Sequence, residues 1–224
     1  SIALRDGVLV SRPYIDTTLQ VMADFGVEAG WDPKNSSCLQ VPAGQSYQAR
    51  EYEIEPDASA AVYPFCAAAI AGGSVRVEGL TRASLQADLA ILDYLQQMGC
   101  RVETDLTGIT VHGPDSALQG LGTVDLNELP DAAITLAVVA TFANSPSRLE
   151  NLANLRIKET DRLAALETEI QRLGGRATAG PDFLSIEPAT LHGAEIETYE
   201  DHRIAMSFAL AGLKVDGVVI RDPG

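Results

Sequence analysis

The densest cluster of polar residues in the chain covers residues 154–162, which read Asn-Leu-Arg-Ile-Lys-Glu-Thr-Asp-Arg and lead into a predicted amphipathic helix. Lys158 and Arg162 are four residues apart and Glu159 and Arg162 three apart, so a helix would place their side chains together. Backbone N–H groups and the helix dipole also favour anions at a helix start. The pattern indicates a site for an anionic ligand, and its alternative is an ordinary capped helix with surface ion pairs.

Three other segments carry polar residues next to a predicted helix start. Glu-Asp-His-Arg occupies residues 200–203, Pro-Asp residues 130–131 and Ser-Arg-Pro-Tyr residues 11–14. Each is also explained by local structure alone, with Asp201 and Asp131 as helix N-caps and Pro13 as a helix-starting proline. Their chemistry therefore depends on whether the fold brings the segments together.

An internal repeat organises the elements that must position these residues. Gly26, Gly99 and Gly174 are 73 and 75 residues apart, and each follows an amphipathic stretch and precedes an extended one. We expect each glycine to end its helix in a left-handed cap. The apolar residues of the three helices follow a helical period and are Ile15, Leu19, Met22 and Phe25, then Leu85, Leu89, Leu92 and Leu95, then Leu163, Leu166, Ile170 and Leu173.

A second set of predicted helices is rich in alanine and begins at Asp57, Asp131 and Asp201, each an expected N-cap. Their small side chains suit helices that are buried on more than one side. Extended segments between the helices predict strands over residues 74–78, 101–104, 108–112, 148–150, 176–178, 183–186 and 217–220. The sequence thus predicts an α/β fold of pseudo-threefold units with parallel crossovers. A polar segment over residues 48–57 predicts a domain boundary near Glu53.

Composition limits the classes of partner. The chain has 16 Lys and Arg against 31 Asp and Glu, a net charge of −15, which argues against nucleic acid or an anionic membrane as the main partner. No apolar run reaches the roughly 20 residues that a membrane span requires. The three cysteines lack metal-ligand spacing, and no phosphate-binding loop, dinucleotide fingerprint, serine-hydrolase elbow or zinc-protease motif occurs.

Taken together, the motifs resemble those of the EPSP synthase (3-phosphoshikimate 1-carboxyvinyltransferase) family. Residues 154–162 match the family pattern Asn-x-Arg-x-Lys-Glu-[ST]-Asp-Arg, and residues 201–206 match Asp-His-Arg-[IM]-Ala-Met. Residues 129–133 and 10–16 follow in family order and spacing. The resemblance implies an inside-out α/β barrel of βαβαββ repeats. It also implies that residues 1–52 form the end of the shikimate-3-phosphate-side domain and residues 53–224 most of a second domain.

The resemblance implies transfer of the enolpyruvyl group of phosphoenolpyruvate to the 5-hydroxyl of shikimate 3-phosphate, without a metal or organic cofactor. Asp131 matches the base that takes the hydroxyl proton, and Lys158 can hold the same hydroxyl. Glu159 matches the acid that protonates the methylene carbon and later takes the proton back.

The resemblance also implies which residues bind the two substrates. Arg162, Arg203 and His202 match positions that bind phosphoenolpyruvate, where paired guanidinium groups suit a carboxylate. The matches to positions that bind shikimate 3-phosphate are Ser11, Tyr14, Asp131, Asn154 and Lys158.

The chain also departs from the family pattern. Four family motifs are absent from these 224 residues, namely Lys-Ser-x-x-x-Arg, Asn-x-Gly-Thr, Ser-Ser-Gln and Lys-Thr-Phe-Pro. Because those motifs hold both substrate phosphates, we expect the chain alone to be inactive and to need the missing domain half as a partner. The alternatives are a relative that acts on UDP-N-acetylglucosamine and a non-catalytic half of a split enzyme. In a bacterium, the expected location is the cytoplasm.

Overall fold

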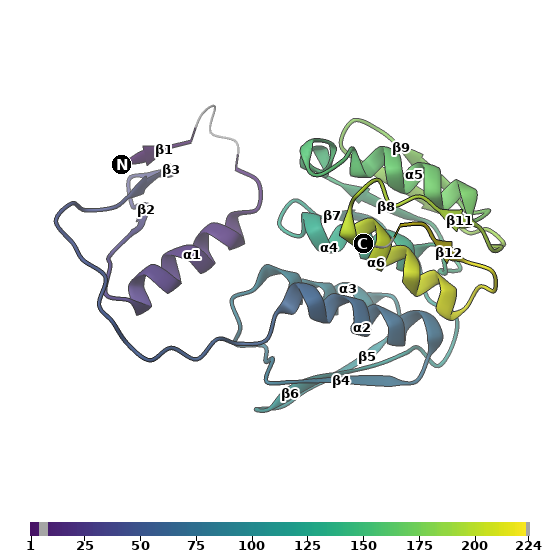
Figure 1. Ribbon diagram of the computed structural model, residues 1–224, viewed down its shortest axis with the longest axis horizontal. Helices are drawn as coiled ribbons and strands as arrows, with labels where there is room; N and C mark the ends of the chain where they lie inside the picture. The colour runs from purple at the N-terminus through teal and green to yellow at the C-terminus, as the bar shows by residue number, and fades with distance from the viewer. Residues whose placement is uncertain (5–8, 223–224) are drawn as a thin grey trace.

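The computed structural model describes residues 1–4 and 9–222 and divides them into two bodies joined by an extended segment (Figure 1). The first body contains β1 (Ile2–Ala3), α1 (Arg12–Asp24), β2 (Gly30–Asp32) and β3 (Asn35–Gln40). Its strands pair antiparallel in the order β1-β3-β2. Residues 41–57 contain no helix or strand and lead to the second body. The boundary predicted near Glu53 falls in this segment and stays a prediction.

The second body begins with a unit built on a three-stranded antiparallel sheet. Its elements are α2 (Ala58–Ala71), β4 (Ser74–Glu78), the 3-10 helix η2 (Ala87–Ala90), α3 (Ile91–Gln97), β5 (Arg101–Thr104) and β6 (Gly108–His112). The strands pair in the order β4-β6-β5. All three strands have the bounds that the sequence predicts, whereas the helix starts later than expected, because Leu85 lies in an exposed loop before it.

The rest of the second body repeats this arrangement. It contains β7 (Gly122–Asp125), α4 (Pro130–Ala140), β8 (Ser147–Glu150), η3 (Ala153–Ile157), α5 (Arg162–Arg172), β9 (Arg176–Ala179), β10 (Leu184–Glu187), β11 (Glu195–Ile196), α6 (His202–Ala209), η4 (Leu210–Leu213) and β12 (Val219–Ile220). The sheet order is β7-β8-β10-β9, and β7–β8 and β11–β12 are parallel pairs that flank α4 and α6. The sequence did not predict β1, β2, β3, β7 and β11.

The alanine-rich helices form the centre of the second body. Helix α4 packs against both α2 and α6, and ten of its eleven residues are buried. The Thr135 and Ser207 hydroxyls hydrogen bond at 2.9 Å between α4 and α6. The sheets lie outside these helices, which is the inside-out arrangement (Figure 1).

The three repeat glycines end their helices as the sequence predicts. Gly26, Gly99 and Gly174 have φ values of +81°, +102° and +86°, and each comes two residues after the last helical residue. A side chain at these φ values would strain the backbone, so glycine is the favoured residue. The two later helices bury their apolar stripes, whereas α1 has no buried residue.

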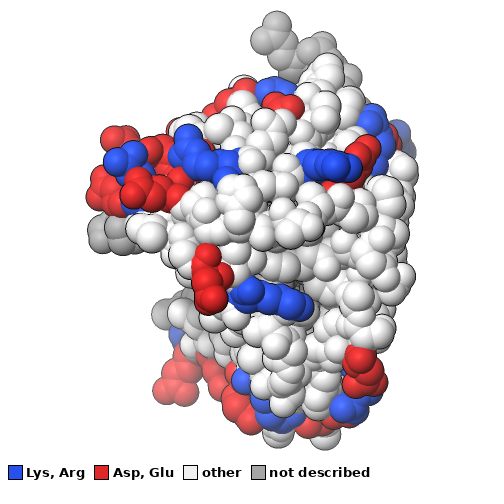
Figure 2. Space-filling view, turned by 90° about the vertical axis from the view of Figure 1, so that its right-hand side faces the viewer, with Lys and Arg blue, Asp and Glu red and all other residues white. Residues whose placement is uncertain are grey.

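Charge is distributed unevenly over the second body. The face furthest from α1 is largely free of charged side chains, which gather in separate patches (Figure 2). Among the described residues, none of the helices combines the length and the apolar character that crossing a membrane requires.

Candidate active site

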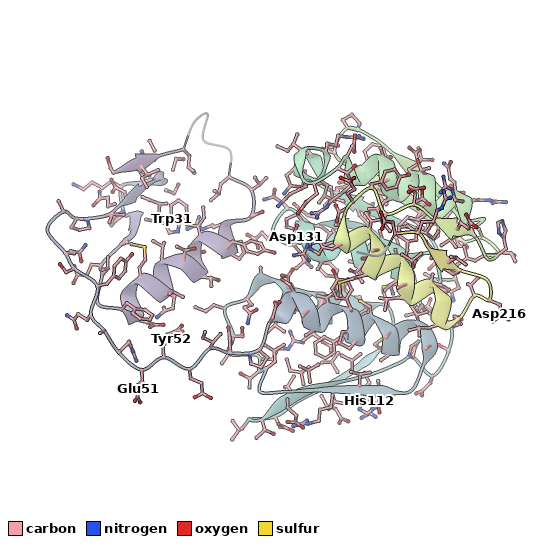
Figure 3. The ribbon with its side chains drawn as sticks, in the orientation of Figure 1. Trp31, Glu51, Tyr52, His112, Asp131 and Asp216 are labelled. Atoms are coloured by element: carbon pink, nitrogen blue, oxygen red, sulfur yellow. The ribbon has the colours of Figure 1, made fainter. Side chains whose placement is uncertain are left out.

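Asp131 lies in the first turn of α4. The other ten residues of the helix are buried, whereas Asp131 is partly exposed. The prediction that it caps the helix is wrong, because α4 begins at Pro130, before Asp131, and Leu129 is the N-cap residue. A proline fits the first position of a helix, where its missing N–H is not needed. The Asp131 carboxylate is therefore free to face the side of the second body that lies toward α1 (Figure 3).

Cations from three other segments converge on the Asp131 carboxylate. Lys158 follows η3, and its Nζ lies 3.6 Å from Asp131 Oδ1. The Arg162 Nη1, at the start of α5, lies 3.2 Å from the same oxygen, and Arg203 Nη2 of α6 lies 3.3 Å from Oδ2. The segments that the sequence singled out separately thus meet at one place.

Arg162 forms the buried floor of this cluster. Its side chain is 1% exposed, and Asp201 receives hydrogen bonds from Nε at 2.7 Å and from Nη2 at 3.2 Å. Nη2 also lies 2.6 Å from Glu159, whose side chain is 47% exposed. Burial would raise the pKa of Asp201, but the bonds from Arg162 outweigh it and hold that pKa below its usual value. Asp201 also caps α6 by accepting a bond from the Arg203 backbone N–H, as predicted.

Arg203 is more accessible than Arg162. Its side chain is 18% exposed, and Asp131 is its one ion-pair partner among the described residues. Burial alone would lower the pKa of Arg203, but the Asp131 carboxylate and weaker neighbours raise it above the ordinary value. The guanidinium thus remains charged and can exchange Asp131 for an incoming carboxylate or phosphate.

The first body reaches this cluster through Tyr14 of α1. The Tyr14 hydroxyl donates to Asp88 of η2 at 3.3 Å to each carboxylate oxygen. Burial raises the pKa of Tyr14, and the charges of Asp88 and Asp131 raise it further, which places the phenol within the field of the cluster. The Thr17 hydroxyl adds a second contact to the backbone oxygen of Leu85 at 3.2 Å.

The other three predicted site residues lie on the segments that carry the cluster and Tyr14. Ser11 is the N-cap residue of α1 and makes no capping bond with its hydroxyl, Asn154 lies in η3 and His202 is the first residue of α6. Within the described part of the chain, none of the three forms a side-chain hydrogen bond or ion pair with Asp131 or its cations. The Asn154 Oδ1 is buried without a hydrogen-bond partner, which is unusual and leaves it an unused acceptor.

Sequence reasoning missed two contributions to the site. Asp88 was not singled out, although it stands four residues before Leu92 and seven before Leu95, so it interrupts an apolar stripe. A carboxylate among the buried positions of a helix is unusual, and this could have identified Asp88 from the sequence. The ion pair of Asp201 with Arg162 joins segments 39 residues apart, and no local pattern reports such a contact. Among the described residues, no group of three or more His, Cys, Asp or Glu side chains could hold a metal ion.

Comparison with solved structures identifies the class of fold. The chain is similar to EPSP synthase from Acinetobacter baumannii, with a TM-score of 0.75, 25% identity and coverage of 91% of this chain and 49% of that one. It is also similar to the enolpyruvyl transferase NikO from Streptomyces tendae, with a TM-score of 0.75, 21% identity and coverage of 96% and 49%. The fold is therefore that of the enolpyruvyl transferases, an inside-out arrangement of α/β repeats.

Sequence comparison then identifies the family. The family model for EPSP synthase (3-phosphoshikimate 1-carboxyvinyltransferase) matches residues 1–224. A 3-phosphoshikimate 1-carboxyvinyltransferase from Nostoc punctiforme is 50% identical over 219 residues, which cover 98% of this chain and 50% of the relative. The chain belongs to the EPSP synthase family. It spans about half the length of the curated relatives it matches.

Proposed function

We propose that this chain supplies the acid–base half of an active site that transfers the enolpyruvyl group of phosphoenolpyruvate to the 5-hydroxyl of shikimate 3-phosphate. The observation that carries the proposal is the position of Asp131, whose carboxylate lies within 3.6 Å of Lys158, 3.2 Å of Arg162 and 3.3 Å of Arg203. The family membership of the chain supports this choice of reaction.

The acid–base roles go to Asp131, Lys158 and Glu159. Asp131 takes the proton of the 5-hydroxyl while the Lys158 ammonium stabilises the developing alkoxide. The oxygen bonds to C2 of phosphoenolpyruvate, and Glu159 delivers a proton to the methylene carbon, which gives a tetrahedral intermediate. The phosphate then leaves with the proton that Asp131 had taken, and return of the methyl proton to Glu159 restores the double bond. The 47% exposure of Glu159 gives it the freedom to move that two proton transfers require.

The carboxylate of phosphoenolpyruvate is assigned to Arg203, Arg162 and His202. Arg203 is the accessible donor, because exchanging Asp131 for the ligand breaks one contact of 3.3 Å. Each of the three guanidinium nitrogens of Arg162 already has a carboxylate partner, and Glu159 is the most exposed of these partners. Arg162 therefore contacts the ligand only when Glu159 turns away, which couples carboxylate binding to the release of the proposed acid. His202 is exposed at the start of α6 and completes the group.

Shikimate 3-phosphate is assigned to Ser11, Tyr14, Asn154, Asp131 and Lys158. Tyr14 brings the first body to the cluster, and Ser11 stands one turn before it with a hydroxyl that makes no capping bond to α1. The unpartnered Asn154 Oδ1 supports this assignment, since a ligand hydroxyl would satisfy it.

The charge of the cluster supports inactivity of the chain on its own. Three cations, Lys158, Arg162 and Arg203, stand among four carboxylates, Asp131, Glu159, Asp201 and Asp88. Two phosphorylated, anionic substrates need a surplus of positive charge, because preorganised electrostatic contacts are usually the largest catalytic contribution. We propose that this surplus comes from the part of the relatives that these 224 residues do not span. The cytoplasmic location stays a prediction.

The experiment compares the chain alone with the chain supplied with the complementary half of the Nostoc punctiforme relative, namely the segments of the relative that these 224 residues do not match. Phosphate release from shikimate 3-phosphate and phosphoenolpyruvate should be undetectable for the chain alone and should appear when both halves are present. Phosphate release by the chain alone would contradict the need for a second half, and its absence from the combined halves would contradict the proposed reaction.

The matched control replaces Asp131 with Asn in the combined halves. Asn keeps the shape of the side chain but cannot take the hydroxyl proton, so activity should fall by about 100-fold or more while the fold persists. Replacing shikimate 3-phosphate with UDP-N-acetylglucosamine tests the alternative acceptor. Activity with that sugar nucleotide in place of shikimate 3-phosphate would favour the alternative enolpyruvyl transferase.

A further inference from the structure

Asp88 is a buried carboxylate to which the proposed reaction gives no role. It lies in η2 with 2% of its surface exposed. Two hydroxyl groups donate hydrogen bonds to the Asp88 carboxylate. The Ser59 hydroxyl of α2 makes a short bond, and the Tyr14 hydroxyl of α1 makes longer contacts of 3.3 Å. Asp88 therefore joins the first body to the core of the second.

The backbone that carries Asp88 is held firmly. Gln86, two residues earlier, donates from Nε2 to the Pro56 backbone oxygen at 2.8 Å. Its Oε1 accepts the Ala58 backbone N–H at 2.7 Å, so one side chain fixes this loop both to the start of α2 and to the segment that joins the two bodies. The Asp88 carboxylate consequently has a defined place relative to α2.

Stability alone does not account for a carboxylate at this position. Within the described residues, Asp88 forms no ion pair with Lys or Arg. Burial raises its pKa, which the Ser59 bond and the charge of Arg203 only partly offset. A carboxyl group whose pKa is higher in the folded than in the unfolded state lowers stability at neutral pH.

The chemistry of the two groups fixes the direction of their hydrogen bond. The Tyr14 hydroxyl donates, and the two carboxylate oxygens of Asp88 accept. The phenol oxygen then keeps its lone pairs and can only accept from a third group. A Tyr14 held in this way recognises a ligand hydroxyl and not a ligand oxyanion.

We propose that Asp88 is the positioning residue for Tyr14: it anchors the start of α1 to the second body and directs the tyrosine oxygen toward a hydroxyl group of the ligand. This inference rests on the proposed function, because that function makes Tyr14 a ligand contact. Asp88 itself touches no substrate and acts through Tyr14.

The test uses the 224-residue chain as Asp88→Asn, Tyr14→Phe and the double variant, with Asp93→Asn as the control. Asp93 lies in α3, with its side chain 60% exposed and paired with Arg82 at 2.8 Å. Hydrogen–deuterium exchange of the backbone amides in the first turn of α1 measures the anchoring. Calorimetric titration of the combined halves, carrying the same substitutions, with shikimate 3-phosphate measures binding.

Asp88→Asn and Tyr14→Phe should each speed exchange in the first turn of α1 by roughly threefold to tenfold, the range of a single hydrogen bond. Each should raise the dissociation constant of shikimate 3-phosphate by a similar factor. The double variant should be no worse than either single one, because both changes remove the same contact. Asp93→Asn should change neither quantity.

Equal behaviour of Asp88→Asn and Asp93→Asn, or additive effects in the double variant, would overturn the proposal. If Asp88→Asn fails to fold, Tyr14→Phe removes only the hydroxyl and decides the same question, since unchanged exchange in α1 would show that no anchor exists. Wild-type combined halves that do not bind shikimate 3-phosphate would count against the proposed function, whereas the exchange rates of the chain would still support or overturn the anchoring by Asp88.

Discussion

Replacing Asp201 with Ala tests the buried ion pair under the site. The substitution removes the two hydrogen bonds of 2.7 and 3.2 Å from Arg162. The Arg162 side chain is 1% exposed, so its guanidinium loses one partner without gaining water. Breaking a buried pair costs about 3–5 kcal/mol, and the lower end applies because Asp131 and Glu159 remain in contact with Arg162. Loss of the N-cap of α6 adds about 1 kcal/mol. The free energy of unfolding should therefore fall by about 4 kcal/mol.

The matched control is Asp57→Ala. Asp57 caps α2 through the Ser59 backbone N–H at 2.8 Å, as Asp201 caps α6, but the described residues offer it no ion pair. Its replacement should cost only about 1 kcal/mol. Urea unfolding followed by far-UV circular dichroism measures both variants. If the two losses differ by less than about 1 kcal/mol, the Arg162–Asp201 pair does not stabilise the fold as we argue.

Three further outcomes follow from the same geometry. Arg162 holds the pKa of Asp201 below its usual value. The resulting stabilisation is present above the unfolded-state pKa of about 4 and is lost as the pH falls through the lower folded pKa. In urea titrations, wild type should therefore lose stability below about pH 4 more steeply than Asp201→Asn. Gly99→Ala should cost roughly 1–2 kcal/mol in thermal unfolding for backbone strain at φ +102°, and Gly174→Ala should cost more, because its added carbon would lie 2.6 Å from a histidine ring. In the combined halves, Asp131→Asn should lower kcat by about 100-fold or more with a smaller change in KM, and an equal change in both would point to a binding role.

Features that depend on one local conformation were predictable from the sequence. The glycines at 26, 99 and 174 end their helices because the left-handed cap favours glycine. Asp57 and Asp201 cap their helices because short acidic side chains suit that position. Strands β4, β5 and β6 were predicted with their bounds because their apolar and polar residues alternate.

Features that depend on tertiary contacts were not predictable in the same way. Asp131 resembles an N-cap in the sequence, but the helix starts at Pro130 with Leu129 as its N-cap, two residues earlier than predicted, and this releases the Asp131 carboxylate for the site. Leu85 fits the helical period of the following stripe, yet it lies in the loop before η2, which Gln86 fixes to the start of α2. The convergence of Lys158, Arg162 and Arg203 on one carboxylate follows from the packing of α4 with its neighbours, which no single motif contains.

The extended segment over residues 41–57 has a mechanical consequence. Among the described residues, it is the one covalent passage between the two bodies. A single tether allows one body to swivel about the chain axis as well as to open and shut, whereas two parallel tethers would restrict it to a hinge. Torsional restraint must then come from contacts between the two bodies, such as the Tyr14 hydroxyl with Asp88 and the Ser11 backbone N–H with the Asn127 backbone oxygen at 3.4 Å.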